Sequence, residues 1–327
     1  MSEELELTSL PGVGPATKQK LNDAGINTIL DLATAGPSEI AESLDVDIVK
    51  AVDLNNKARK KLVELNRLEP DFVSASDLLV KRKKIDRVTT GTKNLDDLLG
   101  GGIETWAITE FYGEFGSGKT QLCHTLCCNV QLPRDQYGLE AAAIYVDTEG
   151  TFRPERIAEI AAARGMDPEA VLKKIIVARA YNSAHQELIV KDVGRVIEAN
   201  KAKLVIIDSA VAHYRAEFLG RGTLAERQQR LNRFMHHLLR IAEIYNVAVV
   251  VTNQVQSAPD SYFGDPTRPT GGHVVAHTST YRIYFRKAGK NRIARMMDSP
   301  YHPERDAAFI LDDKGVDDPP EETSRRK

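Results

Sequence analysis

The sequence predicts an α/β fold with a mostly parallel sheet, preceded by a small all-α domain. Two observations predict it. From about residue 86 onwards, apolar runs of strand length alternate with longer amphipathic stretches. This alternation is typical of parallel strands whose sheet is covered by helices on both faces. The first 65 residues, in contrast, contain only short amphipathic segments of helical character.

The composition is that of a globular protein without an overall basic surface. The 327 residues are 42% hydrophobic, and 44 Lys and Arg residues stand against 46 Asp and Glu residues. A chain of this length can bury one full core and a small second one. Because the net charge is -2, contacts with nucleic acid would have to come from local cationic clusters and backbone groups.

Cysteine usage and hydropathy indicate a soluble protein of a reducing compartment. Cys123, Cys127 and Cys128 lie in one segment, and an odd, clustered set of cysteines is not a disulfide framework. No apolar run reaches the roughly 18 residues of a membrane helix. The acidic segment MSEELELTSL also lacks the apolar stretch of a secretory signal. We therefore expect a cytoplasmic protein.

Three parts are expected along the chain: a helical domain over 1–65, a linker over 66–85 and the α/β core over 86–327. The basic run Lys81–Lys84 and a proline favour a linker, although the stretch around Phe72 is apolar for a fully solvated one. Helices of the first domain are expected near Ile29–Ala35, Glu39–Leu44 and Ile48–Leu65.

The elements of the core follow one another in a regular order. Buried strands are expected at Ala107–Gly113, Ala141–Asp147, Lys203–Asp208 and Val247–Asn253. Helices are expected at Thr120–Leu132, Pro154–Arg164, Glu187–Ala199 and Ala225–Tyr245. Two later segments, YRIYFRKA and RIARMMD, are typical of a hairpin-like pair of strands.

A phosphate-binding loop follows the first strand of the core. Residues 113–120 read GEFGSGKT, which matches G-x-x-x-x-G-K-[ST] between a strand and a helix. Backbone N–H groups of such a loop wrap phosphates, and the helix N-terminus adds positive potential. Lys119 is expected to reach the β and γ phosphates, and the Thr120 hydroxyl to hold Mg²⁺. The residues expected to bind nucleotide are Gly113, Glu114, Phe115, Gly116, Ser117, Gly118, Lys119, Thr120 and Gln121.

Polar residues end three further strands. Asp208 ends an apolar strand, which predicts a metal-binding acid beside the phosphate loop. Asp147 and Glu149 both follow another strand, where an acid can orient the attacking water, and spacing alone does not choose between them. Gln254 follows a fourth strand, where an amide can contact the γ-phosphate. Helix capping and ordinary strand-ending turns are the alternative interpretations of these residues.

In this order, the segments resemble the RecA/RadA family of DNA recombinases over nearly the whole chain. The resemblance is carried by GEFGSGKTQLCH (113–124), YVDTEGTFRPERI (145–157), LVIIDSA (204–210), GRGTLAERQQRLNRF (220–234), TNQV (252–255), GGHVVAH (271–277) and DSPYHP (298–303). It implies a RecA-like P-loop ATPase core and a helix-hairpin-helix domain that binds DNA.

The function that the resemblance implies is ATP-dependent recombination. Such a protein is a DNA-dependent ATPase that forms filaments on single-stranded DNA and catalyses homologous pairing and strand exchange with duplex DNA during repair. The alternative is an accessory RecA-like ATPase or a hexameric DNA motor without strand exchange, which the FRPER and GGH segments disfavour. Recombination mediators are the further partners that the resemblance suggests.

The resemblance also implies roles for individual residues at the nucleotide. Glu149 corresponds to the family's catalytic glutamate and acts with Lys119 and Gln254. Arg156 packs against the adenine, on which a guanidinium can stack. Asp298 and Pro300 belong to a segment that caps the ATP of a neighbouring subunit. Asp298 is further the expected contributor to a site for a monovalent cation such as K⁺, which supports activity in some members.

Two segments resemble the family's DNA loops, 210–227 and 255–272. In the second loop, Tyr262 and Phe263 either stack on bases or pack beneath the loop. One departure from relatives is Ser209–His213, where they more often carry hydroxyl residues. The alternative for the arginines of the first loop is a solvated basic face of a helix. The residues expected to contact DNA are Arg215, Arg221, Arg227, Arg268, Gly271 and Gly272.

Self-association is expected through the linker. Phe72 and Ala75 fit the Phe-x-x-Ala pattern by which the family polymerises, so Phe72 would enter a pocket on the next subunit while its segment adds a strand there. The alternative is that Phe72 packs on its own domain. In the first domain, the Gly12–Gly14 backbone would approach DNA phosphates, or the segment is an ordinary helical hairpin of a packing domain. The three cysteines are expected to be core residues, and the roles of His273 and His277 stay open.

Overall fold

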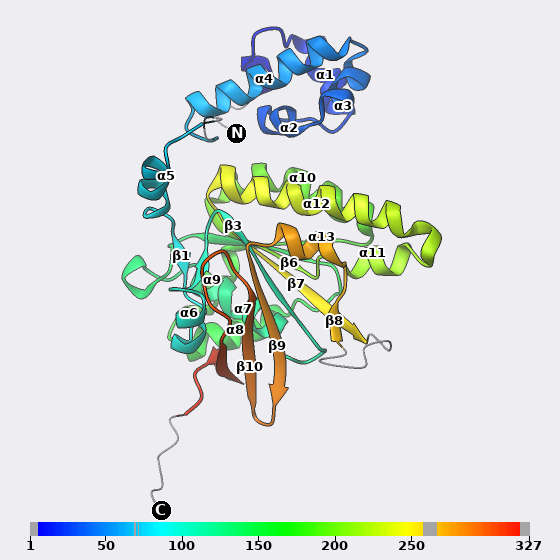
Figure 1. Ribbon diagram of the computed structural model, residues 1–327. Coiled ribbons are helices and arrows are strands. Elements are labelled where there is room, and N and C mark those ends of the chain that lie inside the picture. The colour runs from blue at the N-terminus through cyan, green and yellow to red at the C-terminus, as the bar shows by residue number, and fades with distance from the viewer. Residues whose placement is uncertain (1–5, 69, 71, 258–266, 321–327) are drawn as a thin grey trace, which may run out of the picture. The chain divides into compact units, whose positions relative to one another are not determined.

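The computed structural model describes residues 6–68, 70, 72–257 and 267–320. The chain divides into two compact units, Met1–Lys84 and Ile85–Lys327 (Figure 1). Within the described residues, no helix combines the length and the apolar character that crossing a bilayer takes.

The first unit is all-helical. Its elements are the 3-10 helix η2 (Leu7–Ser9) and the α-helices α1 (Pro15–Asp23), α2 (Ile29–Thr34), α3 (Pro37–Leu44), α4 (Ile48–Glu64) and α5 (Ala75–Arg82). Local sequence explains the helix starts: Thr28 and Asp31 form a capping box on α2, and the Asp47 carboxylate caps α4. Buried Asn55 of α4 donates to the carbonyl oxygens of Leu32 and Ala35, which joins α4 to the end of α2.

The segment 66–85 is not irregular throughout, because it contains α5. The Ser74 hydroxyl accepts a hydrogen bond from the Asp77 amide at 3.1 Å and caps the helix. No residue of α5 is buried, and Phe72, just before it, is 95% exposed. Phe72 therefore does not pack on its own domain in this structure, contrary to the second interpretation considered for it.

The second unit is built on a large, mostly parallel sheet, so the predicted fold class is confirmed. The strand order is β12-β11-β10-β9-β3-β7-β6-β4-β5, with β8 paired to β7. The strands are β3 (Ala107–Gly113), β4 (Ala142–Asp147), β5 (Ile175–Arg179), β6 (Ala202–Asp208), β7 (Ala248–Ser257), β8 (Thr267–Pro269), β9 (Tyr281–Ala288), β10 (Asn291–Asp298), β11 (Asp306–Asp312) and β12 (Gly315–Asp317). A separate two-stranded sheet pairs β1 (Arg87–Val88) with β2 (Ile103–Glu104).

The large sheet has a parallel part and an antiparallel part. The strands β9, β3, β7, β6, β4 and β5 run parallel to one another. The strands β10, β11 and β12 continue the sheet antiparallel from β9. The hairpin-like pair predicted from YRIYFRKA and RIARMMD is thus β9 and β10, and it belongs to the main sheet.

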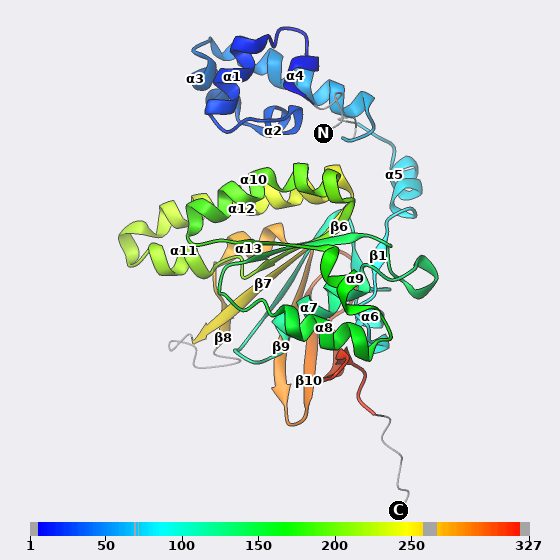
Figure 2. The same cartoon turned by 180° about the vertical axis from the view of Figure 1, so that it is seen from behind.

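Helices cover both faces of this sheet (Figures 1 and 2). The long helices α10 (Ser183–Asn200) and α12 (Leu224–Tyr245) lie on one face, and α7 (Lys119–Asn129) and α8 (Pro154–Ala163) lie on the other. The remaining helices are α6 (Lys93–Leu98), η3 (Arg134–Gln136), α9 (Pro168–Lys173), α11 (Ala212–Glu217), η4 (Arg221–Thr223) and α13 (His273–Thr278).

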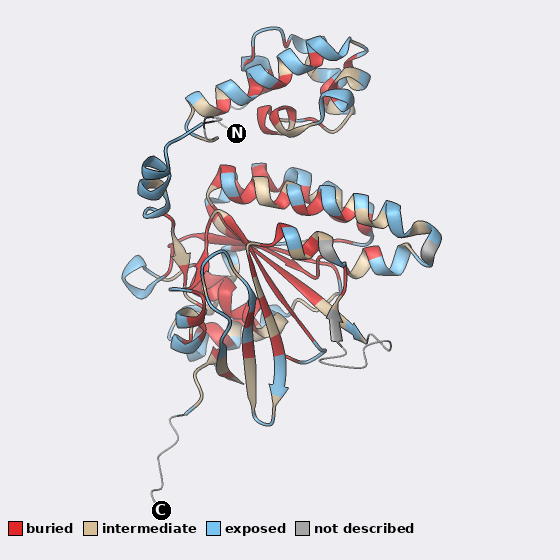
Figure 3. Cartoon of the chain, in the orientation of Figure 1, coloured by how far each residue is buried: buried red, intermediate tan, exposed pale blue. Residues whose placement is uncertain are grey.

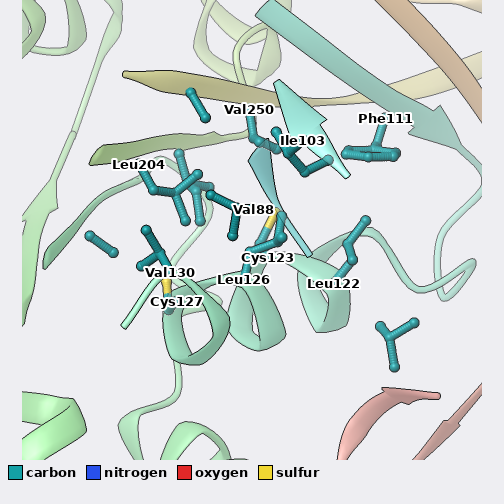
Figure 4. Packing of buried hydrophobic residues seen from close by; sticks show 14 of the residues in the cluster. Val88, Ile103, Phe111, Leu122, Cys123, Leu126, Cys127, Val130, Leu204 and Val250 are labelled. Atoms are coloured by element: carbon teal, nitrogen blue, oxygen red, sulfur yellow. The ribbon is translucent and has the colours of Figure 1, made fainter. Parts of the chain in front are cut away.

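The main core lies between α7 and the sheet. Every residue of β3 and β4 is buried, which explains why both strands are largely apolar (Figure 3). Cys123 and Cys127 of α7 pack among Val88, Leu204 and Val250 in this core (Figure 4). Cys128 is also fully buried, so the three cysteines are confirmed as core residues.

Candidate active site

The predicted active-site residues meet at the carboxyl ends of adjacent parallel strands. Gly113, the last residue of β3, pairs in register with Gln254 of β7. Asp147, the last residue of β4, pairs with Asp208, the last residue of β6. Ligands of open parallel sheets bind at this edge. The register alone therefore brings together four segments that are far apart in the sequence.

The phosphate loop runs from β3 into α7. Gly118 is the N-cap residue of α7 and has a φ of 108°, a left-handed conformation that a side chain would strain. The Lys119 ammonium donates to the carbonyl oxygens of Gly113 and Glu114 at 2.8 and 2.9 Å. Burial lowers the pKa of Lys119, and the carboxylates of Asp208 and Glu149 oppose this shift. A cation held by the loop and aimed at its centre suits a polyphosphate.

Asp208 is the centre of a buried hydroxyl cluster. Its carboxylate accepts hydrogen bonds from Thr120 at 2.8 Å, from Tyr145 at 2.6 Å and from Thr252. The carboxylate of Asp208 and the hydroxyl oxygen of Thr120 are hard oxygen donors, and Mg²⁺ binds through one or two such groups while it keeps waters and phosphate oxygens. This pair therefore fits the predicted Mg²⁺. Within the described residues no cluster of three or more His, Cys, Asp or Glu side chains forms another metal site.

The structure gives different surroundings to Asp147, the last residue of β4, and Glu149, which follows it by two residues. The Asp147 carboxylate accepts hydrogen bonds from the backbone N–H groups of residues 149–152 at 2.7 to 3.3 Å, and it forms an ion pair with Arg179 at 2.9 Å. It is 5% exposed and fully engaged in shaping this turn. Glu149 instead lines an open cavity of about 270 Å³. Of the two acids, only Glu149 is free to meet a substrate water.

Glu149 is joined directly to Gln254. The Gln254 amide nitrogen Nε2 donates to Glu149 Oε1 at 3.1 Å, and the Ser209 hydroxyl donates to the same oxygen at 2.7 Å. Three strand ends, those of β4, β6 and β7, thus contribute to one hydrogen-bonded group. The cavity beside it is lined by Glu149, Ser209, Ala212, Arg215, Ala216, Gln254 and Thr270.

Two further predicted nucleotide residues contact one another. Arg156, in the first turns of α8, donates through Nε to the Gln121 side chain of α7 at 3.0 Å. Its other nitrogens donate to Glu159 at 3.2 Å and to the backbone carbonyl of Asp312. The guanidinium is therefore fixed beside the start of α7. Phe115, at the tip of the phosphate loop, is 93% exposed and makes no comparable contact.

The segment 210–227 is more helical than a loop. Arg215 lies in α11, Arg221 in η4 and Arg227 in the first turn of α12. The helix α11 forms because Tyr214 is buried and donates to Glu187 of α10 at 2.9 Å, while Glu217 accepts a hydrogen bond from the Ser183 amide at 2.6 Å. Arg215 is exposed and lines the cavity beside Glu149.

The second DNA segment is described in part. Arg268 lies in β8, which pairs antiparallel with β7. Gly271 and Gly272 precede α13 and have φ values of 89° and 65°. Tyr262 and Phe263 lie outside the described residues, so their stacking or packing stays open.

The comparisons with known proteins agree with this geometry. A family model described as Rad51 matches residues 81–319, and a model described as a SAM-like helix-hairpin-helix tandem matches residues 4–60. The DNA repair and recombination protein RadA of Cenarchaeum symbiosum is 54% identical over 317 residues, 97% of this chain and 80% of that protein. The protein of the same name from Aeropyrum pernix is 50% identical over 315 residues, 96% of this chain and 97% of that protein.

The chain belongs to the Rad51 family. Both matched relatives carry DNA repair and recombination in their names, which agrees with the function predicted from the sequence segments. No comparison favours the alternative of an accessory ATPase or a ring-shaped motor.

Two predicted residues of this Rad51-family chain lie away from the phosphate loop. Asp298 ends β10, where it pairs with Arg282 near the start of β9, whereas Gly113 pairs with Phe285 further along that strand. Because β10 runs antiparallel to β9, Asp298 lies at the end of this strand pair that is remote from the phosphate loop. The exposed Pro300 lies two residues further along the chain. Contacts of these residues with nucleotide would therefore have to be made on another subunit.

Sequence reasoning missed several members of the site in this Rad51-family chain. Tyr145, Thr252 and Ser209 all donate to the carboxylates of Asp208 or Glu149. Each of these residues lies next to, or two residues from, a motif residue. A hydroxyl group near the end of a buried strand was the sequence feature that could have marked each of them as a site residue. Their partners could not be assigned before the strand register was known.

Proposed function

We propose that this chain is a DNA-dependent ATPase that forms filaments on single-stranded DNA and catalyses homologous pairing and strand exchange in DNA repair. The observation that carries the proposal is the 3.1 Å contact between Gln254 and Glu149. Gln254 precedes the DNA segment 255–272, and Glu149 is the free acid of the ATPase site. One hydrogen bond therefore connects DNA binding with hydrolysis. The names of the matched relatives support the same activity.

ATP and Mg²⁺ are the proposed cofactors. The phosphate loop binds the polyphosphate through its backbone N–H groups, and Lys119 neutralises the β and γ phosphates. Thr120 and Asp208 would hold the metal, which would supply positive charge against the charge that develops during phosphoryl transfer. The fixed guanidinium of Arg156 stacks against the adenine.

Hydrolysis requires that a water be placed and deprotonated. Glu149 accepts the proton of that water, and Ser209 keeps the carboxylate oriented through its 2.7 Å hydrogen bond. Gln254 contacts the γ-phosphate and changes its contact with Glu149 when that phosphate leaves. The state of the nucleotide is thereby passed to the segment that follows Gln254.

DNA contact is proposed to rest on phosphates rather than on base readout. The cationic residues Arg215, Arg221, Arg227 and Arg268 track the backbone, and the Gly271–Gly272 pair lets it approach closely. Homology is tested by base pairing, so the protein itself needs little sequence specificity. The Gly12–Gly14 turn of the first unit adds backbone N–H groups for further phosphates.

Filament formation is proposed to use the exposed Phe72. The strand β5 ends the sheet at one edge, and Val177 in it is 44% exposed. An extended segment around Phe72 from another copy can add to this edge as a further strand while the aromatic ring fills a pocket beside it. Asp298 and Pro300 would then cap the neighbour's ATP, with Asp298 contributing to a K⁺ site. Mediators would act on this same assembly, in the cytoplasm.

The proposed ATPase is tested by measuring ATP turnover with and without single-stranded DNA. We expect DNA to raise kcat, because DNA bound at 255–272 acts on Gln254, which directly precedes that segment and contacts Glu149. A Lys119→Ala variant provides the background rate. Turnover that is present but insensitive to DNA would contradict the proposed coupling, and turnover equal to the Lys119→Ala background would contradict the ATPase assignment itself.

A further inference from the structure

A buried polar cluster lies beside the site but outside the residues that would touch nucleotide. Its members are Glu110 of β3, Asn253 of β7, Thr270 just before α13, and Arg282 of β9. Glu110 and Asn253 are fully buried and Thr270 is 3% exposed. Buried polar groups are costly unless each donor and acceptor is paired, so a cluster of this kind holds a defined geometry.

Asn253 uses all the hydrogen-bonding capacity of its amide. Its nitrogen Nδ2 donates to Glu110 Oε1 at 2.9 Å and to the Thr270 carbonyl oxygen at 2.6 Å. Its oxygen Oδ1 accepts from the Gln254 backbone N–H at 2.8 Å and from the Thr270 hydroxyl at 2.5 Å. One side chain therefore holds both Gln254 and Thr270.

Glu110 fixes the orientation of that amide. Because the carboxylate can only accept hydrogen bonds, it selects the orientation in which Asn253 presents its nitrogen to Glu110 and its oxygen to Thr270. The second carboxylate oxygen accepts from Arg282 Nε at 2.7 Å, which balances the buried charge. The guanidinium of Arg282 lies over the Tyr112 ring at 5.2 Å and is thus held from a second side.

The cluster joins the two ends of one segment. Gln254 directly precedes the segment 255–272 predicted to bind DNA, and Thr270 lies near the end of that segment. The Thr270 backbone N–H donates to the Gln254 carbonyl at 2.8 Å. Thr270 also lines the cavity that contains Glu149 and Gln254. Thr270 is therefore linked through Asn253 to the residue that contacts Glu149.

We propose that Asn253 and Thr270 are positioning residues, held by Glu110, that couple the DNA segment to the Gln254–Glu149 contact. The inference rests on the proposed function, since it assigns the route by which DNA changes hydrolysis. Asn253 keeps the Gln254 backbone in place, and the Thr270 hydroxyl ties the far end of the segment to the same amide.

The test compares Thr270→Val with two matched variants in the full chain. Thr270→Val keeps the shape and removes the hydroxyl, which leaves Asn253 Oδ1 with one of its two donors. Thr270→Ser restores the hydroxyl. Thr109→Val is the control for removing a buried hydroxyl, because Thr109 lies in β3 next to Glu110 and its hydroxyl has no hydrogen-bond partner.

We expect Thr270→Val to reduce the DNA stimulation of kcat by roughly five- to tenfold, because a buried acceptor loses its donor. The KM for ATP should stay at the wild-type value, since Lys119, Thr120 and Asp208 are unchanged, and any fall in basal kcat should be much smaller than the loss of DNA stimulation. Thr270→Ser and Thr109→Val should both behave like the wild type. Unchanged DNA stimulation in Thr270→Val, or an equal loss of basal turnover and ATP affinity, would overturn the inference.

Amide hydrogen exchange provides a readout that does not depend on DNA stimulation. The peptide covering 267–278 should exchange at least about tenfold faster in Thr270→Val than in Thr109→Val, because the link to Gln254 is weakened. If the wild type shows no DNA stimulation, the proposed function fails. The exchange rates of the two variants still test whether the Thr270 hydroxyl holds the segment in place. Equal exchange in the two variants would overturn the positioning role in either case.

Discussion

Replacing Glu149 by Gln is expected to lower ATP turnover by about 10²- to 10⁴-fold, the range that a positioned proton acceptor contributes. The variant keeps the side-chain shape and removes the negative charge that accepts the proton of the attacking water. Nucleotide binding should remain, because the predicted phosphate and metal contacts come from Lys119, Thr120 and Asp208. Steady-state hydrolysis and equilibrium binding of a fluorescent ATP analogue measure the two effects separately.

Glu155→Gln is the matched control for this variant. Glu155 is an exposed acid in the first turn of α8, close in sequence to Glu149 but outside the cavity that Glu149 lines. Its replacement should leave turnover within about twofold of wild type, as expected for a surface change. A Glu149→Gln variant that retains a third or more of wild-type turnover would rule out Glu149 as the proton acceptor.

Replacing Phe72 by Glu is expected to weaken self-association by roughly 30-fold or more. A buried aromatic anchor at the centre of an interface contributes about 2 kcal/mol or more, and a carboxylate in its pocket would lack a partner. Because Phe72 is 95% exposed within its own chain, the substitution should leave the stability of the monomer unchanged. Sedimentation velocity over a range of protein concentrations measures the change in assembly.

Val49→Glu is the control for introducing a charge at an exposed apolar position. Val49 lies in α4 and is 72% exposed. The Val49→Glu variant should have the same sedimentation profile as the wild type. If Phe72→Glu assembles as the wild type does, the chain associates through another surface, and the role proposed for the β5 edge is wrong.

Most of the α/β core could be predicted because its signals are local. Largely apolar runs mark β3, β4, β6 and β7, and the glycine-rich loop with Lys119 marks the junction of β3 and α7. The strands β5, β11 and β12 were not anticipated. In β5, a run of five residues next to a helix carries little periodicity of its own, and its pairing with β4 depends on tertiary contacts.

Two helices, α5 and α11, lie in segments that were predicted to be irregular. A capping signal in the sequence explains the first helix, and tertiary contacts explain the second. The helix α5 had a readable signal, since Ser74 and Asp77 have the spacing of an N-cap pair. The helix α11 had no such cap, and the buried Tyr214 explains why it forms. The choice between Asp147 and Glu149 likewise needed the turn geometry, because both acids follow the same strand.

The buried cluster around Asn253 could not be derived from spacing. Glu110 was visible as a lone acid within an apolar strand, but its partners Asn253 and Arg282 lie 143 and 172 residues away in the sequence. Only the register of β3 with β7 and β9 brings them together.

The central claim is strand exchange, and joint-molecule formation tests it most directly. Labelled single-stranded DNA would be incubated with the protein, ATP and Mg²⁺, and then mixed with supercoiled duplex of matching or unrelated sequence. We predict joint molecules with the matching duplex only, and none with Lys119→Ala. DNA-stimulated ATP hydrolysis without joint molecules on the matching duplex would contradict the recombinase and indicate an ATPase that does not exchange strands.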